Sequence, residues 1–171
     1  SGMDSFIPAH KVGVDGRVLG VDMTDAQIEK ATRLARLRGV QTVTYRKGVI
    51  DDTGLPADAC DCVISNGVIN LAPDKVRVFQ EAARLLKRGG RLALADIVTD
   101  VPLPETVVCN TDLWAACIGG AAQQQDYRAA IELAGLRVER LEENAAYHFM
   151  SERAQKATAK WGVKSISLLA W

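Results

Sequence analysis

The chain of 171 residues is 48% hydrophobic and 25% charged, and its 21 basic residues are balanced by 21 acidic ones. These proportions are typical of a globular domain with a core of its own and exclude a disordered chain. The zero net charge provides no basic surface for nucleic acid or for an anionic membrane. No apolar run approaches the roughly 18 residues of a membrane span, and no signal pattern opens the sequence. We therefore expect a cytoplasmic protein that binds neither nucleic acid nor a membrane.

The four cysteines show no C-x-x-C spacing, which a zinc site would need, and they are too few for a disulfide scaffold. We therefore expect free and mostly buried thiols and no metal site. They are Cys60, Cys62, Cys109 and Cys117.

Short β-rich runs alternate with segments of helical period, a pattern that predicts an α/β fold with a parallel sheet. Expected strands lie at 17–21, 41–46, 61–65, 91–98, 136–141 and 163–170, the last two pairing at one edge. Helices are expected at 4–12, with Pro8 in the first turn, and at 24–39, 73–89 and 123–134, with a polar helix or turn at 151–157. We interpret residues 1–171 as one domain in which 98–122 form a substrate lid.

Local patterns also predict how some of these elements begin and which side they bury. Thr24 and Gln27 have the spacing of a capping box at the start of a helix. The strands at 17–21 and 61–65 are apolar without alternation, as in strands buried on both faces. The expected inner faces of two helices are Ile28, Ala31, Leu34 and Ala35 in the first, and Val76, Phe79, Ala83 and Leu86 in the second.

Ligands of such sheets bind at the carboxyl ends of the strands, so the residues that follow each strand are candidates. Asp22 ends the first strand and can accept hydrogen bonds from ribose hydroxyls, or it can simply complement a helix dipole. Gly48 would let the backbone approach a planar ring on which Ile50 packs, although a tight surface loop is the alternative.

Two later strands end in polar residues whose role the sequence leaves open. Asn66 and Asn70 could line a cleft, yet Asn and Gly also make turns. Asp96 lies within an apolar strand and needs a partner, either a structural hydrogen bond or a substrate.

Several segments together resemble the class I S-adenosylmethionine-dependent methyltransferases, and among these the arsenite methyltransferase-like and ubiquinone/menaquinone-biosynthesis methyltransferases. They are GRVLGVDMT (16–24), DCVISNGVINLAPDK (61–75), EAARLLKRGGRLALADIV (81–98), DLWAACIGGA (112–121) and VKSISLLA (163–170). The resemblance implies a Rossmann-like sheet, mostly parallel with an antiparallel edge strand. It also implies S-adenosylmethionine as cofactor and methyl transfer to a small molecule, either an arsenite-like or a quinone-like acceptor, driven by proximity and alignment.

The resemblance also implies roles for individual residues. Asp22 resembles the acid that binds the cofactor ribose, Met23 its neighbour on the adenine, and Cys117 one of the thiols that bind trivalent arsenic. The implied cofactor residues are Gly2, Asp22, Met23, Gly48, Ile50, Asp51 and Asn66. The implied substrate residues are Asn70, Asp96, Trp114 and Cys117.

The chain departs from the family pattern at three places. Gly67 stands where the arsenite branch has a cysteine, and Val49 where many members have Asp. Ser1-Gly2-Met3 looks like a cloning remnant, and the first strand of the family with its glycine-rich loop is missing before it, so we expect an N-terminally truncated chain. The hypothesis for the gap is that strands 17–21 and 61–65 pair directly, or that a second chain fills it in a homodimer. An alternative function is an inactive domain of this fold that serves dimerisation or ligand binding.

Overall fold

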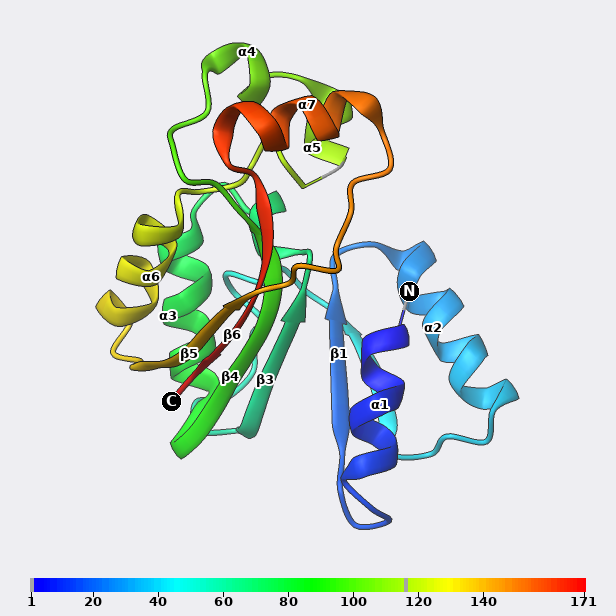
Figure 1. The fold of residues 1–171 in the computed structure, drawn as a ribbon. Coiled ribbons are helices and arrows are strands. Elements are labelled where there is room, and N and C mark those ends of the chain that lie inside the picture. Colours follow the sequence, from blue (N-terminus) through cyan, green and yellow to red (C-terminus); the bar gives the residue numbers. More distant parts are fainter. Residues whose placement is uncertain (1, 116) are drawn as a thin grey trace. The chain divides into compact units, whose positions relative to one another are not determined.

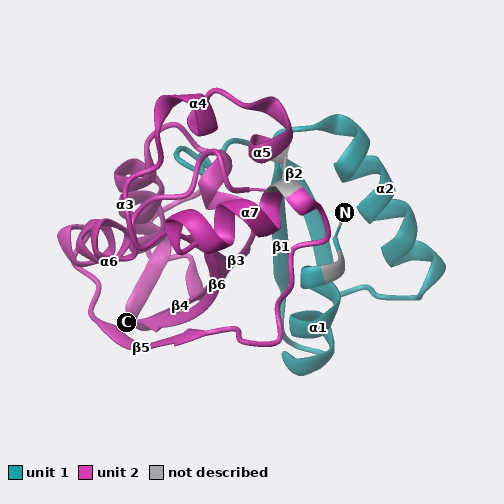
Figure 2. Ribbon diagram, turned by 45° about the horizontal axis from the view of Figure 1, so that its top comes forward, with its two compact units in different colours: residues 1–54 teal, residues 55–171 magenta. Residues whose placement is uncertain are grey.

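The computed structural model describes residues 2–115 and 117–171 (Figure 1). The chain divides into two units, residues 1–54 and residues 55–171, which Figure 2 colours teal and magenta. Each unit has its own sheet.

The first unit pairs two parallel strands with two helices. It contains α1 (Met3–Lys11), β1 (Val18–Asp22), α2 (Asp25–Leu37) and β2 (Val43–Lys47). The strands are in register from Val18 opposite Val43 to Asp22 opposite Lys47. Ala31 and Ala35 of α2 are buried, which confirms the predicted face of this helix.

The second unit is built on a four-stranded mixed sheet of order β3-β4-β6-β5. Its strands are β3 (Cys60–Asn66), β4 (Leu86–Val98), β5 (Val138–Glu143) and β6 (Lys164–Ala170). β3 runs parallel to β4, whereas β6 is antiparallel to both β4 and β5. The chain thus has the expected Rossmann-like α/β fold, with antiparallel pairing at one edge of the sheet of the second unit.

Two helices cover one face of this sheet and supply its core (Figure 1). They are α3 (Lys75–Leu85) and α6 (Gln124–Leu133), and the short 3-10 helix η1 (Ile69–Leu71) precedes α3. The rings of Phe79 and Tyr127 meet edge to face with centroids 5.1 Å apart, so the two helices are joined through fully buried aromatic side chains.

Three short helices gather at the carboxyl end of β4 (Figure 1) and enclose a second apolar cluster. They are α4 (Glu105–Val108), α5 (Thr111–Ala115) and α7 (Glu152–Trp161). The cluster consists of Ile97, Val107, Leu113, Ile118, Ala154, Ala157 and Val163. The helix α7 buries Ala154 and Ala157 in this cluster. The segment 151–157, which we expected to be a polar helix or turn, therefore belongs to an amphipathic helix.

Several local expectations were wrong. Pro8 lies inside α1 rather than in its first turn. The helix α3 ends at Leu85, and Leu86 already begins β4, so the strand starts five residues earlier than predicted. The buried face of α3 includes Phe79 but otherwise differs from the prediction, being Val78, Phe79, Glu81, Ala82 and Leu85.

The strands β1 and β3 are less buried than their composition predicts. Leu19 of β1 is 41% exposed and Ile64 of β3 is 50% exposed. Within the described residues β1 pairs with β2 and β3 pairs with β4, so the first of the two hypotheses for the gap, direct pairing of β1 with β3, is not supported. Both are edge strands, and edge strands are covered less than central ones. None of the described helices has the length and apolar character that crossing a membrane requires.

Candidate functional site

The carboxyl end of β1 holds an oriented carboxylate. Oδ1 of Asp22 accepts hydrogen bonds from the Thr24 backbone N–H at 2.9 Å and from the Thr24 hydroxyl at 2.7 Å. No hydrogen bond to a described residue involves Oδ2 of Asp22, so this oxygen is available to an outside donor. The expected capping box is not formed: Thr24 is the N-cap of α2, but its hydroxyl donates to Asp22 instead of accepting from the helix.

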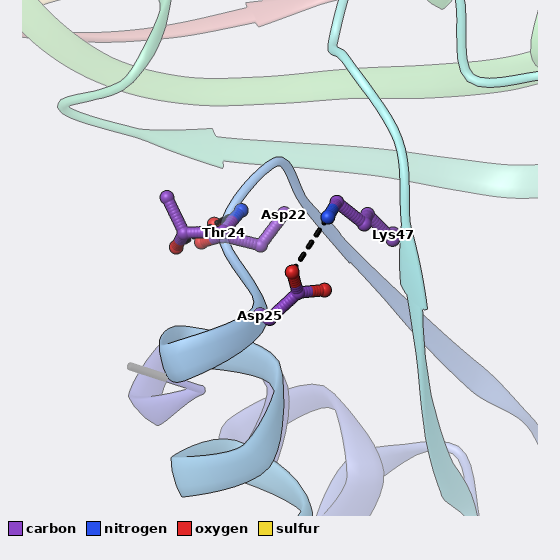
Figure 3. Close-up of polar contacts among 4 residues, drawn as sticks. All are labelled: Asp22, Thr24, Asp25 and Lys47. Carbon is purple, nitrogen blue, oxygen red and sulfur yellow. Dashed lines mark hydrogen bonds and ion pairs between the residues drawn. The ribbon is translucent and has the colours of Figure 1, made fainter.

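The surroundings of Asp22 fix the turn that follows β2. The Gly48 backbone N–H donates to the Asp22 carbonyl at 3.0 Å, and Lys47 forms an ion pair with Asp25 at 2.6 Å (Figure 3). Val49 and Asp52 form a β-bridge, so Ile50 and Asp51 occupy the tip of a tight turn, where both are half-buried.

Two further residues predicted to bind cofactor lie in the first unit. The Met23 side chain is 66% exposed beside Asp22 and can cover a flat ligand. Gly2 has a φ of 78°, and a Cβ added to it would lie 2.8 Å from Cβ of Ala31. Its backbone is therefore packed closely within this unit, at a position that only glycine can occupy.

A buried polar cluster lies at the carboxyl end of β4 in the second unit. Asp96 is 3% exposed, and its carboxylate accepts from the Ile97 N–H at 2.8 Å, the Tyr127 hydroxyl at 3.1 Å and the Asn70 backbone N–H. Burial raises the pKa of Asp96, which the three hydrogen bonds and the charge of Lys75 partly oppose. These contacts give Asp96 the structural role that the sequence left open, and its contact with a substrate stays a prediction.

Asn70 connects this polar cluster to the loop that carries Cys117. Its side-chain amide donates to the Ile97 carbonyl at 2.6 Å and to the Cys117 carbonyl at 3.3 Å. The side chain is fully buried, and its Oδ1 has no hydrogen-bond partner among the described residues.

Cys117 places a thiol at the carboxyl end of β3. Its Sγ donates to the Gly67 carbonyl at 3.3 Å, and burial, followed by the charge of Asp96, raises the pKa of the thiol. Gly67 has a φ of 64° and open space where a side chain would begin. All four cysteines are free, as predicted, but Cys62 and Cys109 are exposed rather than buried.

Trp114 shapes the same loop from α5. Its indole N–H donates to the Val108 carbonyl, and a Cβ added to Gly119 would lie 2.6 Å from Cδ1 of the ring. Trp114 thus packs against the backbone of the glycine pair, and a role in substrate binding stays a prediction.

The structure brings together Asn70, Asp96 and Cys117, while Asn66 lies nearby as the exposed last residue of β3. Sequence reasoning missed three members of this neighbourhood, which are Lys75, Gly120 and Tyr127. The only signal for Gly120 in the sequence was the pair Gly119-Gly120 within the segment DLWAACIGGA (112–121).

Comparison with known proteins is consistent with this arrangement. A family model described as a methyltransferase domain matches residues 1–135. An arsenite methyltransferase of Halobacterium salinarum is 37% identical over 153 residues, which are 89% of this chain and 39% of that protein. The human arsenite methyltransferase is 41% identical over 130 residues, covering 71% of this chain and 35% of its own. This chain therefore spans less than half the length of these two relatives.

A solved structure has the same fold over nearly the whole chain. It is an arsenic(III) S-adenosylmethionine methyltransferase from Chlamydomonas reinhardtii, with a TM-score of 0.79 and 32% sequence identity. The match covers 99% of this chain and 59% of that one.

Proposed function

Since this chain belongs to the class I S-adenosylmethionine-dependent methyltransferases and is similar to the arsenite methyltransferases, we propose that it methylates a small soft acceptor, a trivalent arsenic compound. The observation that carries the choice of acceptor is the Cys117 thiol at the carboxyl end of β3, the sheet edge at which α/β proteins bind ligands. Trivalent arsenic is a soft centre, and thiolates are the protein ligands that soft centres prefer.

The residues around Asp22 fit the cofactor. Oδ2 of Asp22 can accept a hydrogen bond from a ribose hydroxyl, while Thr24 holds the carboxylate through Oδ1. The exposed Met23 and the half-buried Ile50 are the apolar side chains that would contact the adenine. When bound, S-adenosylmethionine supplies an electrophilic methyl group on a sulfonium, so the protein needs no acid or base to activate the donor.

On the acceptor side, Cys117 would bind arsenite by exchange. The thiol sulfur forms a bond to arsenic, one hydroxide leaves the arsenic, and the thiol proton leaves with it as water. Because burial and Asp96 keep this thiol protonated, the proton is present for that departure. Gly67 provides no second thiol, so within this neighbourhood the chain would supply one of the three arsenic ligands.

The test is transfer of a labelled methyl group from S-adenosylmethionine to arsenite. We expect methylated product with the wild type and its loss in Cys117→Ser. Cys62→Ser is the matched control, because it removes an exposed thiol on β3 by the same substitution, and we expect it to retain the product. Binding of S-adenosylhomocysteine without any arsenite-dependent product would reject the acceptor but not the cofactor.

A second candidate is a domain of this fold that binds ligands without methyl transfer. It is favoured by the strand pairing, since among the described residues β1 is paired only with β2 and β3 only with β4. Such a domain would pair an open strand edge with a second copy, so sedimentation would give a dimer. Calorimetric titration with S-adenosylhomocysteine separates the two candidates, because absence of heat at millimolar ligand would reject the enzyme.

A further inference from the structure

The loop that carries Cys117 adopts a backbone conformation that it cannot hold by itself. Cys117 has a φ of 61°, in the left-handed region that residues with a side chain rarely occupy. Such conformations persist only where surrounding contacts impose them. The contacts that impose this one therefore also decide where the thiol points.

The Asn70 side chain makes a polar contact with this loop. Its two amide N–H groups go to two backbone carbonyls, Ile97 at the end of β4 and Cys117 in the loop, which lie 27 and 47 residues away in the sequence. The same side chain leaves its Oδ1 buried and without a partner among the described residues. An unpartnered buried oxygen costs free energy, which offsets part of what the two hydrogen bonds contribute to stability.

Gly120 lets the loop approach the backbone of Asn70. A Cβ added to Gly120 would overlap the Asn70 carbonyl oxygen and lie 3.0 Å from its carbonyl carbon. The backbone and the side-chain amide of Asn70 thus both contact the same short segment. We propose that Asn70 is a positioning residue which, with Gly120, holds the Cys117 loop against the end of β4 and aims the thiol at the carboxyl end of β3.

The position of the sulfur agrees with this arrangement. Cys117 Sγ is 3.3 Å from the Gly67 carbonyl, where burial and the nearby charge of Asp96 keep it protonated. If the loop is released, the thiol leaves both influences and its pKa falls toward the ordinary value for cysteine. The importance of this for catalysis rests on the proposed function, but the positioning itself does not.

The experiment measures the reactivity of Cys117 alone. In a background with Cys60, Cys62 and Cys109 replaced by serine, the rate of alkylation by iodoacetamide is followed from about pH 6 to about pH 9.5, around the usual thiol pKa. The test variants are Asn70→Leu and Gly120→Ala. Asn70→Leu keeps the bulk of the side chain but removes its hydrogen-bond donors, and the Cβ added in Gly120→Ala would overlap the Asn70 carbonyl oxygen. We expect alkylation near neutral pH to be about fivefold faster or more, as the loss of two hydrogen bonds implies, with its pH midpoint shifted downward.

Two controls separate positioning from general loss of stability. Thr99→Val removes a fully buried hydroxyl that has no hydrogen-bond partner in the described part of the chain, and Phe79→Leu loosens the core between α3 and α6. We expect both to leave the pH midpoint unchanged and the rate within about twofold of the parent. Thr99→Val keeps the backbone N–H that donates to the Ala122 carbonyl after the loop, and the ring of Phe79 packs on Tyr127.

The inference is overturned if Asn70→Leu and Gly120→Ala alkylate like the parent, or if Phe79→Leu accelerates the reaction as much as they do. Gly120→Ala keeps the test decisive if Asn70→Leu does not fold. A wild type that never methylates arsenite, but in which both loop variants shift the alkylation profile, would reject the proposed acceptor and still support the positioning of the thiol.

Discussion

Thr24 gives both its backbone N–H and its hydroxyl to one oxygen of Asp22, at 2.9 Å and 2.7 Å. This relationship uses a residue typical of helix caps to hold the carboxylate that ends β1. It leaves the second carboxylate oxygen without a hydrogen bond to any described residue, so that a diol can donate to it. The orientation of Asp22 is therefore a property of the β1–α2 turn and does not depend on a bound ligand.

Replacing Thr24 by valine should weaken cofactor binding. Thr24→Val keeps the branched shape and the backbone N–H but removes one of two hydrogen bonds to Asp22, so we expect affinity for S-adenosylhomocysteine to fall about threefold to tenfold by calorimetry. Lys47→Met is the control, because it breaks an exposed ion pair with Asp25 that contributes at most about 1 kcal/mol to stability. Equal affinities of Thr24→Val and the wild type would show that the hydroxyl does not orient Asp22 for the ligand.

Two glycines at helix ends separate backbone strain from steric overlap. Gly39 and Gly162 have φ values of 66° and 60°, but space is open around Gly39, whereas a Cβ on Gly162 would lie 2.8 Å from Cβ of Asp100. Gly39→Ala should cost about 1 kcal/mol of unfolding free energy through its backbone conformation. Gly162→Ala should cost about 1 to 3 kcal/mol more through overlap with Asp100, measured by urea unfolding. Equal losses would contradict the close approach at the end of α7.

Removing the Tyr127 hydroxyl tests the hydrogen bond to Asp96. Tyr127→Phe keeps the edge-to-face contact with Phe79 and should lower the unfolding free energy by about 1 to 3 kcal/mol. Tyr147→Phe is the control, since Tyr147 is half-exposed and the same change there should stay within about 0.5 kcal/mol. A double-mutant cycle with Asp96→Asn should show coupling, and simple additivity would argue against the contact.

The buried carboxyl of Asp96 should give stability a defined pH dependence. Its pKa is raised mainly by burial, so near and above pH 3.8, the ordinary value for the group, the folded chain holds a proton that the unfolded chain has lost. The contribution of this carboxyl to unfolding free energy is then complete below pH 3.8 and is lost as pH rises through the folded pKa. The stability of the wild type minus that of Asp96→Asn should therefore decrease as pH rises, in urea unfolding at a series of pH values. A difference that grows with pH would show that hydrogen bonds, not burial, dominate at this site.

Local sequence patterns determined the elements of this fold and the place of one carboxylate. The alternation of β-rich runs and helical periods predicts all six strands and the longer helices, because each depends on residues that are neighbours in the chain. Asp22 was found in the same way, since the end of a strand can be recognised without knowing what packs beside it.

Only the tertiary structure decided which polar groups meet. The face that α3 buries depends on α6, whose Tyr127 packs on Phe79 from 48 residues farther along the chain. The hydrogen bond from Asn70 to Cys117 joins residues 47 apart, and the need for glycine at position 120 arises only from the Asn70 backbone across that gap. Chain-local propensity carries no information about such pairs, because their partners are chosen by packing. The sequence by itself thus locates the candidate cofactor acid, whereas the position of the thiol depends on the packed fold.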